Sequence, residues 1–123
     1  MGPVSVKIPA GSEYVMIARL AASGFCSRIG LDIDKTEDVK VTISEILNRC
    51  IIINEDINRS IELEFCSDQV FFSITFKLGN IKGIINSSDT GDLGFSIIKA
   101  LADGIEFKNE DELILKFGIK ENQ

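Results

Sequence analysis

The sequence predicts an α+β fold, a two-layer α/β sandwich in which one mostly antiparallel sheet carries helices on one face. Apolar residues alternate with polar ones in five short segments, as in strands with one buried face. They recur at helical spacing in three longer segments. The resulting order is strand, helix, helix, strand, strand, loop, helix, strand, strand, for which one sheet under one layer of helices is the simplest packing. The length suits a single domain, residues 1–123.

The first helix is predicted between a short strand and Gly30. The strand is indicated by alternation at Val4, Val6 and Ile8. Ser12 is the expected N-cap of the helix, and Gly30 is its expected C-terminal stop. Helical spacing gives the expected apolar face as Tyr14, Ile17, Ala18, Ala21 and Phe25.

The second helix is predicted over residues 35–52. Asp34 and Glu37 have the spacing of a capping box, with Asp in place of Ser or Thr. The expected buried stripe consists of Val39, Ile43, Ile46, Leu47 and Cys50. The opposite face is expected to carry the polar side chains Asp38, Glu45, Asn48 and Arg49.

The second half of the chain is predicted to contain two hairpins with a helix between them. The first hairpin turns at 67–69, between strands whose apolar positions are Ile61, Leu63 and Phe65, then Val70, Phe72, Ile74 and Phe76. Residues 79–91 have the composition of a loop. The third helix is expected over 93–103, with core candidates Ile97, Ile98, Leu101 and Ala102. The last strands flank a turn at 109–111 and carry Ile105 and Phe107, then Leu113, Leu115, Phe117 and Ile119.

Composition excludes several classes of function. The chain has no histidine, so Ser-His and Cys-His nucleophile pairs and histidine-ligated metal sites are excluded. Its three cysteines stand far apart and fit neither a disulfide framework nor a CxxC motif. The formal net charge of -6 disfavours direct binding of nucleic acid. Without an apolar run long enough for a membrane span or a signal peptide, a cytoplasmic protein without a membrane partner is expected.

Several segments, in their order and spacing, resemble the anti-sigma factor serine kinases. The segments are 14–20 (YVMIARL), 23–24 (SG), 27–30 (SRIG), 37–40 (EDVK), 44–45 (SE) and 91–95 (GDLGF). These kinases are partner-switching regulators of transcription with the ATPase fold of gyrase, Hsp90 and histidine kinases, called the GHKL or Bergerat fold. The resemblance implies this fold, ATP and Mg²⁺ as cofactors, and a serine kinase activity.

The resemblance implies a general base on the second helix, and Glu45 stands at its position. The family has a magnesium-ligating Asn four residues later, where this chain has Arg49. Asn48, one residue earlier, lies near Glu45 on the helix surface and is the candidate Mg²⁺ ligand. The alternative interpretation is an ordinary surface ion pair between Glu45 and Arg49.

The resemblance also implies an Asp-x-Gly motif after the first hairpin, whose Asp accepts a hydrogen bond from the adenine amino group. The aligned residues here are Lys77, Leu78 and Gly79, so the glycine is kept and the acceptor is replaced by a cation. Lysine only donates hydrogen bonds and cannot recognise that amino group. This departure predicts weak or absent ATP binding.

The phosphate side of the implied site also departs from the family pattern. Eleven residues separate Gly79 from Gly91, which suits a surface connection better than a lid over a triphosphate. Gly91 and Gly94 keep the glycine turn at a helix N-terminus, where unpaired N–H groups bind phosphate. Asp92 replaces a family glycine, and its carboxylate is expected to cap the helix and repel phosphate. Gly79, Gly91 and Gly94 are thus candidate nucleotide-binding positions in a degenerate site.

These departures favour a binding module over an enzyme. We predict an anti-sigma factor-like regulatory protein of a partner-switching system, which binds a sigma factor or an anti-sigma antagonist and has weak or absent ATP binding. The resemblance implies a homodimer and a sigma-binding surface on the first helix and the neighbouring loop. Tyr14 and Arg19 are the candidate partner contacts, although Arg19 also suits an ordinary solvated position.

Two alternatives remain from the sequence. An active ATP-dependent serine protein kinase would phosphorylate an anti-sigma factor antagonist and use Glu45 to activate the serine hydroxyl. A domain of the sulfate-transporter-and-antagonist type is suggested by the serine-containing loop 87–91 ahead of a helix. Two consecutive helices after one strand do not suit that second fold.

Overall fold

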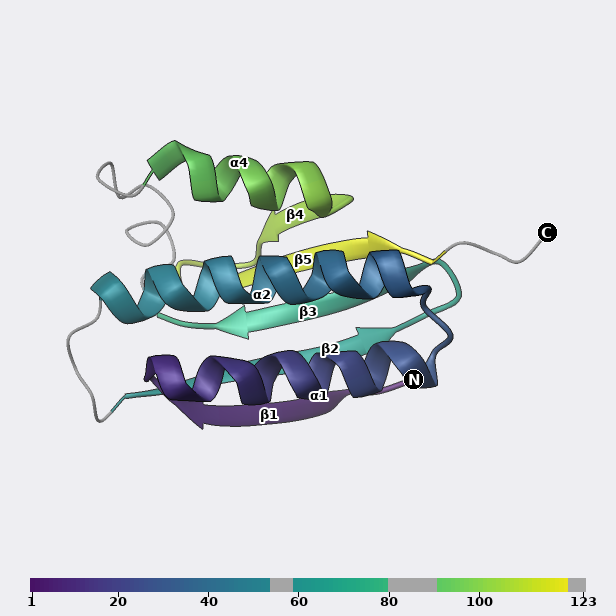
Figure 1. Ribbon diagram of the computed structural model, residues 1–123, viewed down its shortest axis with the longest axis horizontal. Coiled ribbons are helices and arrows are strands. Elements are labelled where there is room, and N and C mark those ends of the chain that lie inside the picture. The colour runs from purple at the N-terminus through teal and green to yellow at the C-terminus, as the bar shows by residue number, and fades with distance from the viewer. Residues whose placement is uncertain (54–58, 80–90, 120–123) are drawn as a thin grey trace.

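The computed structural model describes residues 1–53, 59–79 and 91–119, which form a two-layer α+β sandwich (Figure 1). The described strands are β1 (Val4–Pro9), β2 (Ser60–Ser67), β3 (Phe71–Lys77), β4 (Gly104–Phe107) and β5 (Glu112–Gly118). The described helices are η1 (Ser12–Tyr14, a short 3-10 helix), α1 (Val15–Arg28), α2 (Ile33–Ile53) and α4 (Gly91–Leu101). The predicted fold class and order of elements are confirmed.

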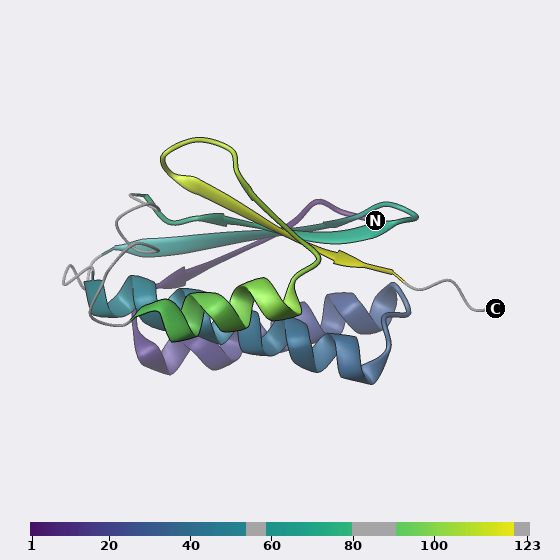
Figure 2. The ribbon, with the colours of Figure 1, turned by 90° about the horizontal axis from the view of Figure 1, so that it is seen from above.

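The five described strands form one sheet in the order β1-β2-β3-β5-β4, with every pairing antiparallel. Figure 2 shows α1, α2 and α4 on one side of this sheet, and no described element covers the other side. The pairs β2–β3 and β4–β5 are the two predicted hairpins. In the first turn, Asp68 Oδ1 accepts hydrogen bonds from the N–H groups of Val70 and Phe71, at 2.7 Å each.

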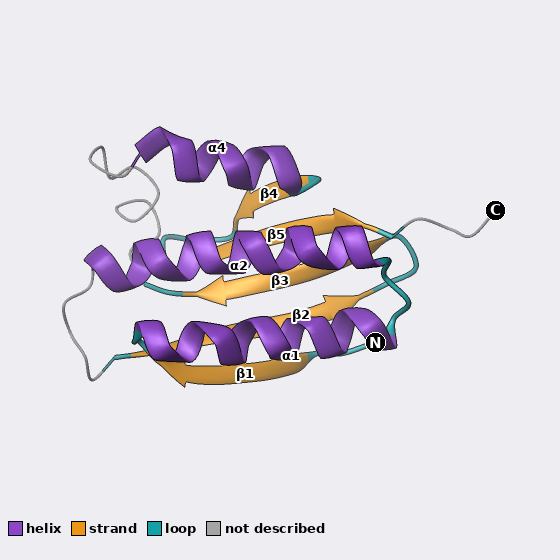
Figure 3. Cartoon of the chain, in the orientation of Figure 1, coloured by secondary structure: helices purple, strands orange, loops and turns teal. Residues whose placement is uncertain are grey.

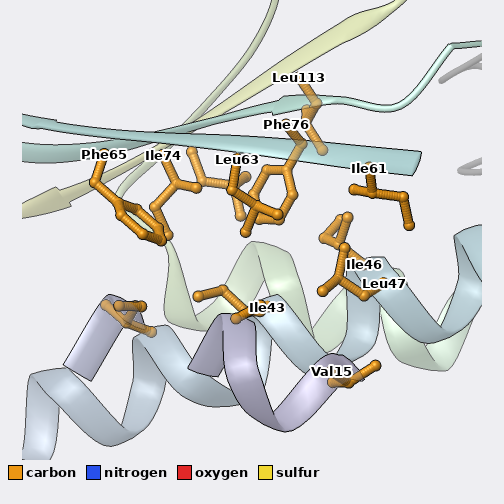
Figure 4. Close-up of a cluster of buried hydrophobic side chains, with 14 of the residues drawn as sticks. Val15, Ile43, Ile46, Leu47, Ile61, Leu63, Phe65, Ile74, Phe76 and Leu113 are labelled. Carbon is orange, nitrogen blue, oxygen red and sulfur yellow. The ribbon is translucent and has the colours of Figure 1, made fainter. Parts of the chain in front are cut away.

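The core lies between the sheet and the helices (Figure 4). Alternation along β2 and β3 turns their apolar side chains toward the helices and their polar side chains away. The whole predicted stripe of α2 is buried: Val39, Ile43, Ile46, Leu47 and Cys50. At one end of the core, neighbouring aromatic rings lie 5.4 to 6.2 Å apart between centroids, in the cluster Phe25, Phe65, Phe72 and Phe117.

The start and the buried face of α1 differ from the prediction. Ser12 is not the cap of α1, because it lies in η1, which precedes the helix. The buried residues of α1 are Val15, Ala18, Ala22, Phe25 and Cys26. Ile17 was predicted to be buried but is 50% exposed, as are Met16 at 65% and Leu20 at 63%. Apolar residues surround α1 on every side, so their spacing alone does not select the buried face.

The turn between α1 and α2 is closed by local hydrogen bonds. Gly30 ends α1 as predicted, with φ of 78°, and the Leu31 N–H donates to the Cys26 carbonyl at 2.9 Å. The cap of α2 is Asp32 instead of the predicted Asp34, because Asp32 Oδ1 accepts a hydrogen bond from the Lys35 N–H at 2.7 Å. The helix therefore begins at Ile33, earlier than predicted.

The third predicted helix, α4, is shifted toward the N-terminus of its predicted range. It begins at Gly91 and ends at Leu101, whereas 93–103 was predicted. Ile98 is fully buried, while Ile97, Leu101 and Ala102 are half-buried. Within the described ranges, no helix combines the length and apolar character that a membrane crossing requires.

Candidate functional site

The elements that carry the predicted nucleotide residues meet at one end of the molecule (Figures 1 and 3). These are the C-terminal end of α2, the C-terminal end of β3 and the N-terminal end of α4. Glu45 and Asn48 lie on α2, Gly79 follows β3, and Gly91 and Gly94 lie in the first turn of α4. The fold thus brings the predicted residues of three separate segments to the same end.

Glu45 and Asn48 project from the side of α2 that faces away from the sheet. Asn48 is exposed and lies opposite the buried stripe of the helix, and Glu45 is half-buried at the margin of that exposed side. Their spacing of three residues makes them neighbours on the helix surface. This geometry is compatible with the predicted base and metal ligand, and it assigns neither role.

Arg49 was predicted on the polar face of α2 but is buried, with 4% of its surface exposed. Lys35 pairs with Asp103, just beyond α4, at 2.9 Å, so this side of α2 faces α4. Arg49 follows Lys35 by about four helical turns and therefore projects toward the same side. The exposed Glu45–Arg49 pair is accordingly wrong. A guanidinium held where the family has its metal-ligating Asn opposes a divalent cation by charge repulsion.

Lys77 lies on the uncovered face of the sheet, away from the helices. Its Nζ is 3.3 Å from Glu62 Oε2 and 3.5 Å from Glu64 Oε2 on the neighbouring strand. The hydrogen bond to Glu62 and then the charge of Glu64 raise the pKa of Lys77, so the side chain stays protonated at neutral pH. Lys77, the cation predicted at the adenine position, therefore forms its ion pairs on the face of the sheet that points away from the helices.

A different arginine occupies the turn after β3, which we call the Gly79 corner and define as Arg59, Leu78 and Gly79. Arg59 Nη2 donates a hydrogen bond to the Leu78 carbonyl. A Cβ at position 79 would overlap the Arg59 guanidinium, and Gly79 has φ of 75°. The side chain beside Gly79 is thus a hydrogen-bond donor, whereas the resemblance implies an acceptor in this motif. Arg59 was not identified from the sequence. The available signal was Gly79, which is present although the aspartate of the implied motif is replaced by Lys77.

The phosphate side of the site is only partly described. Gly91 begins α4, so the N-terminal N–H groups of a helix are present where a phosphate was predicted. The predicted cap by Asp92 and the shortened lid, residues 80–90, lie outside the described side chains and residues. In the described part of the chain, no three His, Cys, Asp or Glu side chains form a metal-binding group. The Mg²⁺ role of Asn48 stays a prediction.

The predicted partner contacts lie at and near the start of α1. Tyr14 ends η1 and is half-buried against the core. Arg19 is half-buried, and its Nε is buried without a hydrogen-bond partner. Met16, one helical turn before Arg19, is exposed, and so is Leu20. An exposed apolar patch beside an incompletely bonded guanidinium is typical of a protein-binding surface.

An open groove of about 350 Å³ lies where α1 turns into α2. It is lined by residues of both helices: Ser23, Ser27, Gly30, Leu31, Ile33, Thr36 and Glu37. This groove was not predicted, because its walls come from two helices and its lining residues share no one chemical type. It contains none of the predicted nucleotide residues.

Comparisons with known proteins agree with the resemblance found in the sequence. No protein-family model matches the chain. The chain is 27% identical over 128 residues to the serine-protein kinase RsbW of Halalkalibacterium halodurans, covering 91% of this chain and 79% of the relative. It is 28% identical over 125 residues to RsbW of Oceanobacillus iheyensis, covering 87% and 79%. A match to RsbW of Bacillus subtilis reaches 38% identity over 64 residues, or 50% of this chain and 40% of the relative.

The chain is similar to RsbW. A solved structure agrees at the level of the fold, namely the RsbU and RsbW domains of Rv1364c from Mycobacterium tuberculosis. The TM-score is 0.65 at 14% identity, over 98% of this chain and 32% of that longer chain. Together these similarities support a relation to the RsbW family, in agreement with the resemblance to anti-sigma factor kinases in the sequence.

Proposed function

We propose that this protein is an anti-sigma factor-like regulator of a partner-switching system, which works in the cytoplasm by binding a sigma factor or an anti-sigma antagonist. In this proposal ATP and Mg²⁺ bind weakly or not at all. The relation to RsbW supports the class of system, and the residues at the implied nucleotide site argue against retained cofactor binding.

The Gly79 corner carries this proposal. Adenine is recognised by giving its amino group an acceptor, and a buried polar group left without a partner costs about 1–3 kcal/mol. Arg59 supplies donors there, and its Nη2 already donates a hydrogen bond to the Leu78 carbonyl. Arg49 adds a buried positive charge at the position implied for a metal ligand. The residues present therefore do not fit Mg-ATP.

The exposed side of α1 supports the binding role. Met16 and Leu20 are more than 60% exposed, at 65% and 63%, although they are large and apolar. Arg19 lies one helical turn from Met16 and is half-buried, and a guanidinium is a donor that pairs well with a carboxylate of a partner. The resemblance implies a partner surface on this same helix, with Tyr14 at its start. Homodimer formation belongs to the proposal on the resemblance alone.

The first test is thermal unfolding of the protein with and without millimolar Mg-ATP. A ligand at 100 times its dissociation constant stabilises a protein by about 2.7 kcal/mol, which corresponds to a shift of several degrees in the melting temperature. We expect a shift below about one degree. A shift of several degrees would remove the main argument against nucleotide binding.

The second test measures binding to purified sigma factors and anti-sigma antagonists. We expect one of them to bind, and Leu20→Asp to weaken that binding by roughly tenfold or more, because a charge then enters the apolar patch. Val70→Asp is the matched control, since Val70 is 58% exposed in the β2–β3 turn and not on α1. Absence of binding to any of these proteins would refute the partner assignment.

A serine protein kinase is the second candidate. The position of Glu45 on the outward side of α2, within reach of solvent, favours it, and so does the name of the relatives. Glu45 would accept the proton of a serine hydroxyl on the antagonist. Transfer of label from γ-labelled ATP to an antagonist, lost in Glu45→Gln, would establish this candidate in place of the first.

A further inference from the structure

The backbone at Arg59 is held beside the sheet by a hydrogen bond. Arg59 immediately precedes β2, and its carbonyl accepts a hydrogen bond from the Ala10 N–H at 2.8 Å, just beyond β1. The Leu78 N–H is held in turn by the Asp111 carbonyl at 3.1 Å. Both sides of the contact between Arg59 and Leu78 are therefore fixed by the sheet, although 19 residues separate them in the chain.

The contact uses the Leu78 carbonyl, a backbone acceptor of the Gly79 corner. The Arg59 guanidinium donates to the Leu78 carbonyl and lies over Gly79, in the space that any side chain at position 79 would need. Lys77 is turned to the other face of the sheet, where it is paired with Glu62 and Glu64. An amino group entering the corner would thus find the Leu78 carbonyl already hydrogen-bonded to Arg59.

We propose that Arg59 is an internal plug of the Gly79 corner: its guanidinium fills the space beside Gly79 that a flat, amino-bearing ring would need, and it occupies the Leu78 carbonyl, which could accept a hydrogen bond from that ring. This inference rests on the proposed function and gives the physical cause of its weak nucleotide binding. The glycine at position 79 is kept here because the arginine and the positive φ require it, without a bound base.

The plug predicts that removal of the arginine opens the corner to a purine. Adenosine is the probe, because it has the amino-bearing ring and no phosphate, so Arg49 and the start of α4 do not affect the result. By isothermal titration calorimetry, Arg59→Ala is expected to bind adenosine roughly tenfold or more tightly than the unaltered protein, since it frees one acceptor and the ring's space. Arg28→Ala is the matched control, because Arg28 is exposed at the far end of α1.

A second measurement tests the same contact without a ligand. Gly79→Ala is expected to lower the melting temperature by several degrees in the unaltered protein, and clearly less in the Arg59→Ala background. The strain of the positive φ is common to both backgrounds and cancels, so the difference reports the overlap of the new methyl group with the guanidinium.

The outcomes separate the plug from the proposed function. Equal adenosine binding by the unaltered protein and a folded Arg59→Ala variant would overturn the plug, and so would equal effects of Gly79→Ala in the two backgrounds. Neither result involves a protein partner. The regulator proposal fails instead if the unaltered protein responds strongly to Mg-ATP or binds none of the candidate partners.

Discussion

The two ends of the molecule are held together by different chemistry. Where α1 turns into α2, carboxylates close the structure: Asp32 caps α2, and Asp103 bonds the Gly118 N–H at 2.6 Å and Lys35 at 2.9 Å. At the opposite end, where α2 finishes, the groups near the chain turns are the arginines Arg49 and Arg59.

The difference shows that the described groups near the chain turns carry opposite charges at the two ends. The carboxylates at the first end bond to backbone N–H groups and a lysine of the same chain, so they serve stability. Of the arginines at the second end, Arg49 stands at the position where the resemblance implies a metal ligand, and Arg59 lies against Gly79. In the proposed function, this positive charge is one reason that Mg-ATP binds weakly or not at all.

The largest effect is expected from the aromatic cluster at the first end. Phe72→Ala should lower the free energy of unfolding by about 3–5 kcal/mol, because Phe72 is fully buried between Phe25, Phe65 and Phe117. Phe71→Ala is the control, with 37% exposure, and should cost below about 1 kcal/mol. Denaturation in guanidinium chloride measures both, and similar costs would contradict the placement of the core.

At the second end, two substitutions of Arg49 distinguish the effect of its packing from the effect of its charge. Arg49→Ala should lower the free energy of unfolding by about 2–4 kcal/mol, because it empties a site between α2 and α4. Arg49→Met should lower the free energy of unfolding much less than Arg49→Ala does, because an apolar side chain of similar length replaces a buried charge at little net cost. Equal losses in the two variants, measured by denaturation, would show that the charge itself stabilises this end.

Substitution of Asp103 tests the hydrogen bond and the ion pair that its carboxylate makes. Asp103→Ala removes the hydrogen bond from the Gly118 N–H and the ion pair with Lys35, and should cost about 1–2 kcal/mol. The melting temperature is then expected to fall by roughly 4–8 °C. Lys35→Met removes the ion pair alone and should cost less, so a larger loss in Lys35→Met would contradict the dominance of the backbone bond.

Asp68 gives a pH-dependent test in the β2–β3 turn. Hydrogen bonds from the Phe71 and then the Val70 N–H lower the pKa of Asp68 below its usual 3.8. A carboxyl group with a lowered pKa stabilises the fold fully above its unfolded pKa, and this contribution is lost as the pH falls through the folded pKa. Asp68→Asn should therefore reduce the loss of stability between neutral pH and about pH 3. Identical pH profiles would contradict these hydrogen bonds.

The smallest effect is expected from Lys77. Lys77→Asp restores the family's residue in sequence, but its side chain would lie on the uncovered face beside Glu62 and Glu64. The response of the melting temperature to Mg-ATP should remain that of the unaltered protein, with Lys77→Ala as control. A new ATP-dependent shift in Lys77→Asp would place position 77 in the nucleotide site.

Features that depend on local sequence were the predictable ones. The strands and the stripe of α2 follow from alternation and helical spacing, because each has one clearly apolar face. The buried face of α1 was not predictable, since Met16, Ile17 and Leu20 are as apolar as the residues that are buried. Only packing on the sheet selects between these faces.

The candidate site was predictable in its positions but not in its contacts. The resemblance located Glu45 and Gly79 on the elements that the structure brings to one end. It did not reveal that Arg49 is buried toward α4, or that Arg59 reaches Leu78, because these contacts join distant segments. A charged residue next to a polar connection looks solvated in sequence, and only the fold shows what lies beside it.

The two margins of the sheet limit how copies of this chain can associate. β1 and β4 are the edge strands, and an edge strand is a template for strand addition unless it is blunted. β1 carries Lys7 and ends in Pro9, both exposed, and β4 has 4 residues. Lysine, proline and shortness each oppose the pairing of a further strand. Self-association by extension of the sheet is thereby disfavoured at both margins.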